Sequence, residues 1–437
     1  ECVVIPLQHR NAPTWGATMP EMLRMLFASG VRKVAVNAKF DMLWLRVKYG
    51  IVVRHLYIDP QLAQHLLNEG VSVSVSLKQL VWRYFPEDGG YEDELVENGY
   101  AKLEEQDEEK LYRYSALDSI FALRLVDKVI PQLREKGMER LYFDIVNPTI
   151  STLVDMEYAG FQVDFDILRV QKQQMDVKLQ TMERQLRADT MIHDDERESF
   201  SFNSLQQLSK VLNDRYGMPV IARTDGGQPQ LTADILEEYA RRGCVFAKRL
   251  VEYRKAQKIR NTYLQNFEEK NVDGLVHCDY SMLTPAGSRL SSSNPNMQNL
   301  PMEVRDCFRT RFSGGKLVQL DFSQVEMRVM AYYSGDKALR DAFVRGRDIH
   351  AEVAARIRSI REKREVSIGE ITSEERGQAK AINFALIYGG THYTLAGATG
   401  LTTEQAERFQ SDYFLAFPMV RAFQNNIRNR IRAGDMV

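Results

Sequence analysis

The sequence predicts a multidomain chain of the α/β and α+β classes. Its 437 residues are more than one hydrophobic core normally organises, so roughly two to four domains are expected. Strand-like runs at 2–7, 33–37 and 51–59 alternate with a helical segment, Met19 to Ala28, which is an α/β pattern. A buried strand is expected at Leu317–Phe322, because it is a short apolar run.

The other elements follow from their own periodicity. Helical spacing governs 76–135 and most of 140–270, with long amphipathic stretches at Ile167–Arg187 and Leu231–Glu268. The segment 287–301 is rich in Ser, Asn and Pro and is expected to be a loop. Helices fill most of the chain after the strand at Leu317–Phe322, and the first of them is expected to begin near Ser323.

Composition narrows the class of protein. Hydrophobic content of 44% and charged content of 27% are those of a soluble globular protein, and no apolar run or leader segment indicates a membrane. The four cysteines form no CxxC pair, which fits a reducing cytoplasm without zinc or disulfides. Net charge is −1, although basic residues concentrate in the C-terminal third. Because the chain starts at Glu1 with strand-like residues, we expect an internal fragment.

Two polar arrangements suggest a site. Arg376, Lys380, Phe384 and Tyr388 recur every four residues and would share one helix face, where two cations and two aromatics suit a nucleoside triphosphate. An amphipathic helix with core aromatics explains the same spacing. Asp321 ends the apolar strand beside an expected helix start, a position that suits a divalent cation or simply a helix cap.

The longest motifs resemble the family A DNA polymerases, the group of bacterial polymerase I and phage replicases. Residues 320–336 (LDFSQVEMRVMAYYSGD) are similar to the family's first palm motif, and 376–389 (RGQAKAINFALIYG) to its fingers motif. Residues 287–301 (GSRLSSSNPNMQNLP) resemble its primer-template loop, with Thr284 ahead of it. Glu375 departs from the family, in which Arg is frequent at this place.

The resemblance extends towards the N-terminus. Residues 147–164, 202–212 and 251–263 are similar to the family's thumb and its flanking segments. Residues 37–41 (NAKFD) and 114–118 (YSALD) resemble the second and third motifs of its 3′–5′ proofreading exonuclease.

The implied architecture is an RNase H-like exonuclease domain followed by a right-hand polymerase with a helical thumb, a partial palm and helical fingers. The expected domains are the exonuclease at 1–136, the connector and thumb at 137–277, the first part of the palm at 278–343, and the fingers at 344–437.

The resemblance implies template-directed DNA synthesis with two Mg²⁺ ions per active site, for which Mn²⁺ is a possible substitute. Asp321 and the Phe322 carbonyl would hold metal, and Lys380 would also protonate the leaving pyrophosphate. Glu326 would exclude the ribose 2′-hydroxyl together with an aromatic partner. The deoxynucleotide-binding set is Arg376, Lys380, Phe384, Tyr388, Gln324, Glu326 and His350. For His350, a capping or satisfied surface histidine is the alternative.

Primer-template DNA is the second implied partner. Arg289, Asn296, Gln298 and Asn299 would bind it, and the minor groove suits a test of pairing geometry because its acceptors barely differ among base pairs. A processivity factor stays open, and the implied location is the cytoplasm of a bacterial or phage-infected cell.

In the exonuclease part, Asp41 and Asp118 would bind metal while Tyr114 orients the attacking water. Ordinary helix caps are the alternative for both carboxylates. The family's first exonuclease motif is expected upstream of residue 1 and its third palm motif beyond Val437. Two other functions therefore stay open: a DNA- and nucleotide-binding module without catalysis, and a stand-alone exonuclease with a helical appendage.

Overall fold

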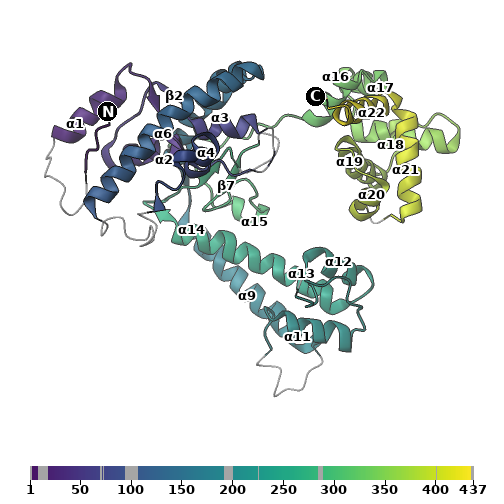
Figure 1. Cartoon of the computed structure of the whole chain (residues 1–437). Coiled ribbons are helices and arrows are strands. Elements are labelled where there is room, and N and C mark those ends of the chain that lie inside the picture. Colours follow the sequence, from purple (N-terminus) through teal and green to yellow (C-terminus); the bar gives the residue numbers. More distant parts are fainter. Residues whose placement is uncertain are drawn as a thin grey trace. The chain divides into compact units, whose positions relative to one another are not determined.

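The chain divides into two compact units, Glu1–Leu317 and Val318–Val437, each of which we describe by itself (Figure 1). The computed structural model describes residues 2–7, 18–68, 71, 73–93, 107–190, 200–224, 226–283, 289–399 and 401–434. Thr284, Gly287 and Ser288 of the expected primer-template segment lie outside these ranges.

The first unit begins with an α/β region. Its elements are α1 (Thr18–Ala28), β1 (Lys33–Val34), α2 (Ala38–Tyr49), β2 (Leu56–Ile58), α3 (Pro60–Leu67), α4 (Leu77–Tyr84), η1 (Pro86–Asp88), α6 (Glu108–Glu135), α7 (Glu139–Leu141), η3 (Tyr142–Val146) and α8 (Asn147–Ala159). β1 and β2 pair in parallel. The apolar sides of α2, α3, α6 and α8 share one core.

Polar side chains fix the helix starts of this region. Asp59, Ser76 and Asp107 each accept hydrogen bonds from backbone amides in the first turn of α3, α4 and α6. Asp59 also accepts from the amide of Ala38, which ties the start of α2 to the start of α3. Desolvation of this buried carboxylate raises the pKa of Asp59 to about 6.

The rest of the first unit is mainly helical. Its elements are β3 (Phe161–Gln162), α9 (Phe165–Asp189), α11 (Leu205–Lys210), η4 (Val211–Arg215), α12 (Ala233–Arg241), α13 (Val245–Lys258), η5 (Ile259–Gln265), α14 (Asn266–Glu269), β4 (Asn271–Val272), β5 (Leu275–Val276), β6 (Asp279–Ser281), β7 (Ser291–Ser293) and α15 (Met302–Arg305). The expected helix at Leu231–Glu268 is broken at Gly243, whose φ of 90° no L-residue adopts readily.

Two cores hold this region together. One lies among α9, α11, α12 and α13, and the other among α9, η5 and the short strands. β5 lies between β3 and β4 in an antiparallel sheet, and β6 pairs with β7 as an antiparallel hairpin. β7 lies inside the segment 287–301 that the sequence predicts as a loop, and residues 294–301 follow it.

Helices are the only regular elements in the described residues of the second unit. Its elements are α16 (Val325–Ser334), α17 (Lys337–Val344), α18 (Ile349–Glu362), η6 (Ile368–Glu370), α19 (Ser373–Ile387), α20 (His392–Thr399), α21 (Thr403–Ala416) and α22 (Pro418–Arg432). Their apolar faces surround one core that includes Ile349, Ile382 and Tyr413. α19 packs on α18 and α20 within that core.

Two strand predictions are wrong. Residues 317–322 form no strand, and Leu320 and Phe322 are 90% and 84% exposed. An apolar run becomes a strand only where a neighbouring strand accepts and donates its hydrogen bonds, and no described segment pairs with 317–322. Residues 2–7 likewise adopt no regular structure. None of the described helices has the length and hydrophobicity needed to cross a bilayer.

Candidate functional site

The four-residue stripe predicted from the sequence lies on α19. Arg376, Lys380 and Phe384 belong to the helix, and Tyr388 follows its last residue. Thr372 and Glu375 start the helix with a capping box, in which each side chain accepts from the other residue's backbone amide. Glu375, which stands where Arg is frequent in the family, thus has a local structural role at the start of α19. Lys380 and Tyr388 are exposed, whereas Phe384 is partly buried.

Arg376 is held by a carboxylate of the neighbouring helix. Its Nε donates a 2.6 Å hydrogen bond to Oδ2 of Asp348, which also caps α18 through the amides of His350 and Ala351. Partial burial pushes the pKa of Asp348 upward, but the hydrogen bonds from Arg376 and these amides outweigh it and hold the pKa below its usual range. The guanidinium is therefore oriented while it remains accessible to a ligand.

His350 is buried, so the prediction of a capping or surface histidine as its alternative role is wrong. Its Nδ1 lies 3.0 Å from Nδ2 of buried Asn383 in α19, and its ring lies 6.2 Å from that of Phe384. Desolvation lowers the pKa of His350, with Asp348 acting in the opposite direction. The neutral imidazole accepts from Asn383 and fixes α18 against the stripe on α19.

Glu326 and Tyr388 lie together although 62 residues separate them. The Tyr388 hydroxyl donates a 3.3 Å hydrogen bond to Oε1 of Glu326 in the first turn of α16. Gln324 directly precedes α16 with a φ of 53° and makes no side-chain cap. The contact places the Glu326 carboxylate beside the aromatic end of the stripe.

Asp321 and the neighbouring Phe322 lie in an exposed segment without regular structure. The alternative role of a helix cap is not realised, because Gln324 is the residue that precedes α16. Among the described residues, no group of three or more His, Cys, Asp or Glu side chains could hold a metal ion. Asp321 and the Phe322 carbonyl are oxygen donors of the kind that Mg²⁺ prefers, but they supply only part of a coordination shell.

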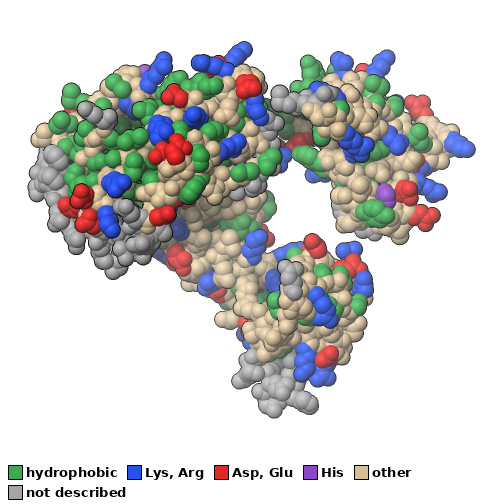
Figure 2. Space-filling model, viewed as in Figure 1, with side chains coloured by type: hydrophobic (Ala, Val, Ile, Leu, Met, Phe, Trp, Pro, Cys, Tyr) green, Lys and Arg blue, Asp and Glu red, His purple; other side chains and the backbone are tan. Residues whose placement is uncertain are grey.

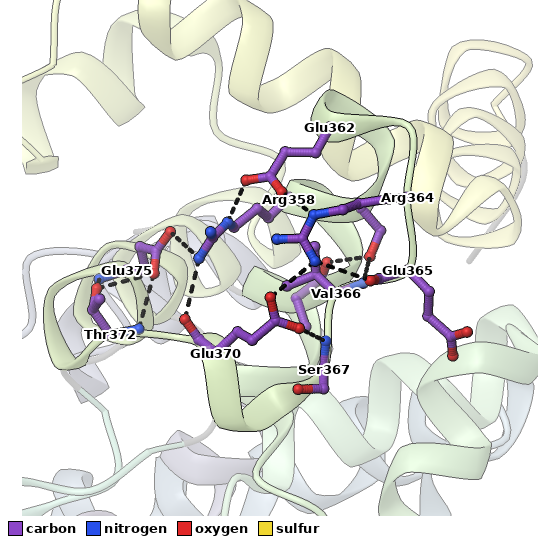
Figure 3. Close-up of polar contacts among 11 residues, drawn as sticks. Arg358, Glu362, Arg364, Glu365, Val366, Ser367, Glu370, Thr372 and Glu375 are labelled. Carbon is purple, nitrogen blue, oxygen red and sulfur yellow. Dashed lines mark hydrogen bonds and ion pairs between the residues drawn. The ribbon is translucent and has the colours of Figure 1, made fainter.

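An ion-pair network fixes the connection between α18 and α19 (Figure 3). Arg358 contacts Glu362 at 2.6 Å and Glu375 at 3.5 Å, while Arg364 contacts Glu362 at 2.7 Å and Glu370 at 2.9 Å. The guanidinium of Arg358 also donates to the carbonyl of Glu370. Each exposed pair contributes little, but together they join both helices through one turn and so set the start of the stripe.

The predicted DNA-binding residues form a loop with internal hydrogen bonds. Oδ1 of Asn296 accepts from the amides of Gln298 and Asn299, and Nε2 of Gln298 donates to the carbonyl of Leu290. The Asn299 carbonyl accepts a 2.6 Å hydrogen bond from Tyr263 in η5. Asn296 thus shapes the loop, while the side chains of Gln298, Asn299 and Arg289 are exposed.

The three predicted exonuclease residues line one cavity of about 920 Å³ in the first unit. Asp41 lies in the first turn of α2, whose N-cap is Asn37, and Asp118 lies within α6, one turn after Tyr114. Neither carboxylate is a helix cap, so that alternative is wrong. Desolvation raises the pKa of Asp41 to about 6. Two carboxylates facing one cavity fit a divalent cation.

Tyr91 is a contact of Asp118 that the sequence motifs did not indicate. Its hydroxyl donates a 2.5 Å hydrogen bond to Oδ1 of Asp118, and its ring stacks on Tyr114 at 6.1 Å and packs on Phe121 at 4.9 Å. Desolvation raises the pKa of Asp118, while the hydrogen bonds from Tyr91 and Tyr114 act in the opposite direction. The two phenols hold the carboxylate in one orientation.

An ion pair ties the second exonuclease motif to α8. Lys39 contacts Oε1 of buried Glu157 at 2.5 Å, and the same oxygen accepts from the amide of Tyr280 in β6. Removing one partner of such a pair leaves a buried charge uncompensated. The start of α2, and with it Asp41, is therefore fixed relative to α8 and β6.

Two families of known proteins match this chain, one near each end. The family described as DNA polymerase family A matches residues 166–437, and a family described as 3′–5′ exonuclease matches residues 1–134. The first match covers more than half of the 437 residues. The chain therefore belongs to DNA polymerase family A. Polymerase and exonuclease domains of these kinds generally use divalent metals.

Two bacterial relatives match most of the chain. The chain is 29% identical to DNA polymerase I of Pseudomonas aeruginosa over 407 residues, which cover 91% of this chain and 43% of that protein. It is 30% identical to DNA polymerase I of Lactococcus lactis subsp. cremoris over 398 residues, 88% of this chain and 44% of that protein. The chain thus spans less than half the length of these relatives.

One solved structure is similar to almost the whole chain. The structure described as the POL domain of Pol1 from M. smegmatis in complex with DNA primer-template and dNTP superposes with a TM-score of 0.78. It is 26% identical in sequence, and the similarity covers 96% of this chain and 70% of that one.

Proposed function

We propose that this chain carries the nucleotide- and primer-binding parts of a template-directed DNA polymerase, together with its 3′–5′ proofreading exonuclease region. The observation that carries the proposal is the contact between Glu326 and Tyr388 at the end of the Arg376–Lys380–Phe384 stripe. It puts a carboxylate gate, an aromatic platform and two cations within one helical unit. That combination suits the sugar, base and phosphates of a deoxynucleoside triphosphate.

Each side chain of the nucleotide site has a proposed task. Arg376 and Lys380 bind the triphosphate, and Lys380 gives a proton to the leaving pyrophosphate. Phe384 stacks on the sugar and base, Tyr388 closes the base-pair pocket, and Glu326 excludes a 2′-hydroxyl. Gln324 lies next to this gate, and His350 supports the phosphate side from beneath the stripe.

Two Mg²⁺ ions per site, or Mn²⁺ in their place, would supply charge neutralisation and an activated oxygen nucleophile. Asp321 and the Phe322 carbonyl would hold metal in the polymerase site, and Asp41 and Asp118 in the exonuclease site. Tyr114 orients the attacking water there. Tyr91 keeps Asp118 in the orientation that such binding requires.

The DNA partner is a primer-template duplex. Arg289, Gln298 and Asn299 face its minor groove, and Asn296 holds the loop that presents them. The proposed domains are the exonuclease at 1–136, the connector and thumb at 137–277, the first part of the palm at 278–343 and the fingers at 344–437. The matches at 1–134 and 166–437 support the division between exonuclease and polymerase. The bacterial relatives support a cytoplasmic location.

A second function is a DNA- and nucleotide-binding module without catalysis. The observation that favours it is that Asp321 has no carboxylate cluster around it among the described residues. A measurement of primer-template and dNTP binding distinguishes both of these functions from an unrelated role. We expect a fluorescent primer-template with a dideoxy-terminated primer to bind the chain, and the next correct dNTP to tighten that binding.

Lys380→Ala should abolish the dNTP effect, whereas Lys337→Ala, an exposed lysine of α17, should preserve it. Primer extension in Mg²⁺ then separates the two functions. Extension that is lost in Asp321→Asn supports the polymerase, and binding without extension supports the module. Extension that Asp321→Asn leaves intact would refute the metal assignment, and a chain that binds neither DNA nor dNTP would refute both functions.

A further inference from the structure

The last turn of α19, which ends at Tyr388, is closed by backbone hydrogen bonds. The amide of Gly390 donates to the carbonyl of Ala385 at 2.8 Å, and the amide of Gly389 donates to the carbonyl of Leu386 at 3.0 Å. These two bonds are the Schellman pattern, and Gly389 has the left-handed φ of 76° that this pattern requires. Tyr388 is the C-cap residue of the helix, so its position depends on this turn.

Side chains of two other helices add donors to the same turn. Nε2 of Gln424 in α22 donates to the carbonyls of Leu386 at 2.6 Å and Ile387 at 3.4 Å. Nε2 of Gln410 in α21 donates to the carbonyl of Gly390 at 3.2 Å. The last carbonyls of a helix have no partner within the helix, so donors from outside fix their positions.

A cation acts on the same turn. Figure 2 shows Lys and Arg side chains on the visible face of the second unit. Arg428 of α22 differs from an ordinary solvated cation, because its Nη2 donates to the carbonyl of Gly389 at 3.4 Å. The C-terminal end of a helix carries partial negative charge, which favours a cation there. We call Gln410, Gln424 and Arg428 the terminal clamp of α19.

The helix α22 supports both partners of the Glu326–Tyr388 contact. Gln424, which is 9% exposed, donates to the end of α19 beside Tyr388. The ring of Phe423 stacks on that of Tyr333 in α16 at 6.3 Å, and α16 packs on α22. Glu326 lies in the first turn of α16. One helix therefore contacts both the helix that carries the carboxylate and the turn that carries the phenol.

The amide group of Gln424 matters more here than its size. A methionine would fill nearly the same space but would offer no hydrogen-bond donor. The amide adds direction, because it meets two carbonyls whose positions determine where Tyr388 leaves the helix. The terminal clamp thus favours one orientation of Tyr388.

We propose that Gln424 is a positioning residue for nucleotide selection. Through the terminal clamp it holds the hydroxyl of Tyr388 against Glu326, which keeps the gate carboxylate in the place that a ribose 2′-hydroxyl would need. The proposal rests on the nucleotide-binding function proposed above. Gln424 contacts neither nucleotide nor metal in this scheme and acts only through Tyr388.

The test measures nucleotide selectivity by binding, so it does not require the chain to extend a primer. The next correct dNTP and the matching ribonucleotide are titrated in Mg²⁺ into the chain bound to a primer-template with a dideoxy-terminated primer. In Gln424→Met, the dissociation constant of the ribonucleotide divided by that of the dNTP should fall about fivefold, a typical effect of losing one hydrogen bond. Asn425→Met, on the exposed side of α22, is the matched control and should leave this ratio unchanged.

A double mutant distinguishes positioning from a general loss of structure. Tyr388→Phe combined with Gln424→Met should give the same ratio as Tyr388→Phe alone, within about twofold, because both changes remove one contact. Additive losses of selectivity would overturn the proposal. An equal loss of affinity for both nucleotides in Gln424→Met, with the ratio unchanged, would also overturn it.

Arg428→Met is the second variant, at an exposed member of the terminal clamp. It should lower the ratio by about twofold or more. Where thermal unfolding shows that Gln424→Met does not fold, an unchanged ratio in Arg428→Met overturns the proposal. The proposed function stands in all of these cases if the dNTP still tightens primer-template binding by the parent chain. A parent chain without that effect overturns both.

Discussion

The hydroxyl of Tyr388 at the end of α19 donates a 3.3 Å hydrogen bond to Oε1 of Glu326 in α16. This contact joins two motifs that the sequence keeps 62 residues apart. It also fixes the carboxylate on the side of the stripe where the sugar of a nucleotide is expected.

Glu326→Ala should raise ribonucleotide use relative to deoxynucleotide use by about tenfold or more, equivalent to ~1.4 kcal/mol in transition-state free energy. The side chain that occupies the 2′ position is gone in this variant. Tyr388→Phe keeps the ring but frees the carboxylate, so its effect should be smaller. Primer extension with each nucleotide type measures both ratios, and an unchanged ratio in Glu326→Ala contradicts the gate assignment.

Asp348→Asn should tighten binding of a deoxynucleoside triphosphate by several fold. The carboxylate competes with the triphosphate for Arg376, whereas an Asn side chain can still accept from the amides that start α18. Calorimetric titration with a non-hydrolysable triphosphate measures the change. Glu352→Gln, at the carboxylate that pairs with Arg347, is the matched control. Weaker binding in Asp348→Asn would show that the ion pair orients Arg376 more than it competes.

Tyr91→Phe should weaken Mn²⁺ binding in the exonuclease cavity by about tenfold or more, the usual effect of removing a hydrogen bond to a metal ligand. The ring contacts with Tyr114 and Phe121 remain in this variant. Electron paramagnetic resonance of Mn²⁺ gives the affinity without requiring cleavage. Tyr84→Phe removes a hydroxyl that contacts Gln64 and should leave the affinity unchanged. Equal losses in both variants would point to a general loss of structure.

His350 should make the second unit less stable below neutral pH. Its pKa is lowered in the folded chain by desolvation, so an unfolded chain binds a proton first as the pH falls through its ordinary value of 6.5. The contribution of neutral His350 to the stability of the fold is therefore complete above pH 6.5 and is lost as the pH falls below it. Thermal unfolding of the parent chain between pH 7.5 and about 5 should show this loss, and His350→Gln should show less of it. His392→Gln is the control, and an equal slope in His350→Gln contradicts the prediction.

Local patterns in the sequence determined most of the helices. The stripe from Arg376 to Lys380 and Phe384 lies on one helix because i and i+4 side chains of any α-helix share a face. The exonuclease residues Tyr114 and Asp118 are neighbours for the same reason. Such contacts require only the local backbone, so the order of residues is sufficient to predict them.

The tertiary structure alone decided the partners of these residues. Asp348 holds Arg376, Asn383 faces His350, and Tyr91 binds Asp118. The sequence signal for Asp348 was weak, an Asp two places before His350, and Tyr91 lies 27 residues before Asp118, too far for a local pattern. Contacts between distant residues depend on how the helices pack, and local periodicity does not contain that information.

The segment from Leu317 to Phe322 shows most plainly the difference between what local sequence predicts and what the tertiary structure decides. Its apolar residues predict a strand, yet it forms none in the described chain, because a strand exists only through hydrogen bonds with a neighbour. The sequence by itself predicted which residues would bind a nucleotide, DNA and metal. Only the tertiary structure decided which of them meet, since helix contacts are local and pairing, packing and burial are not.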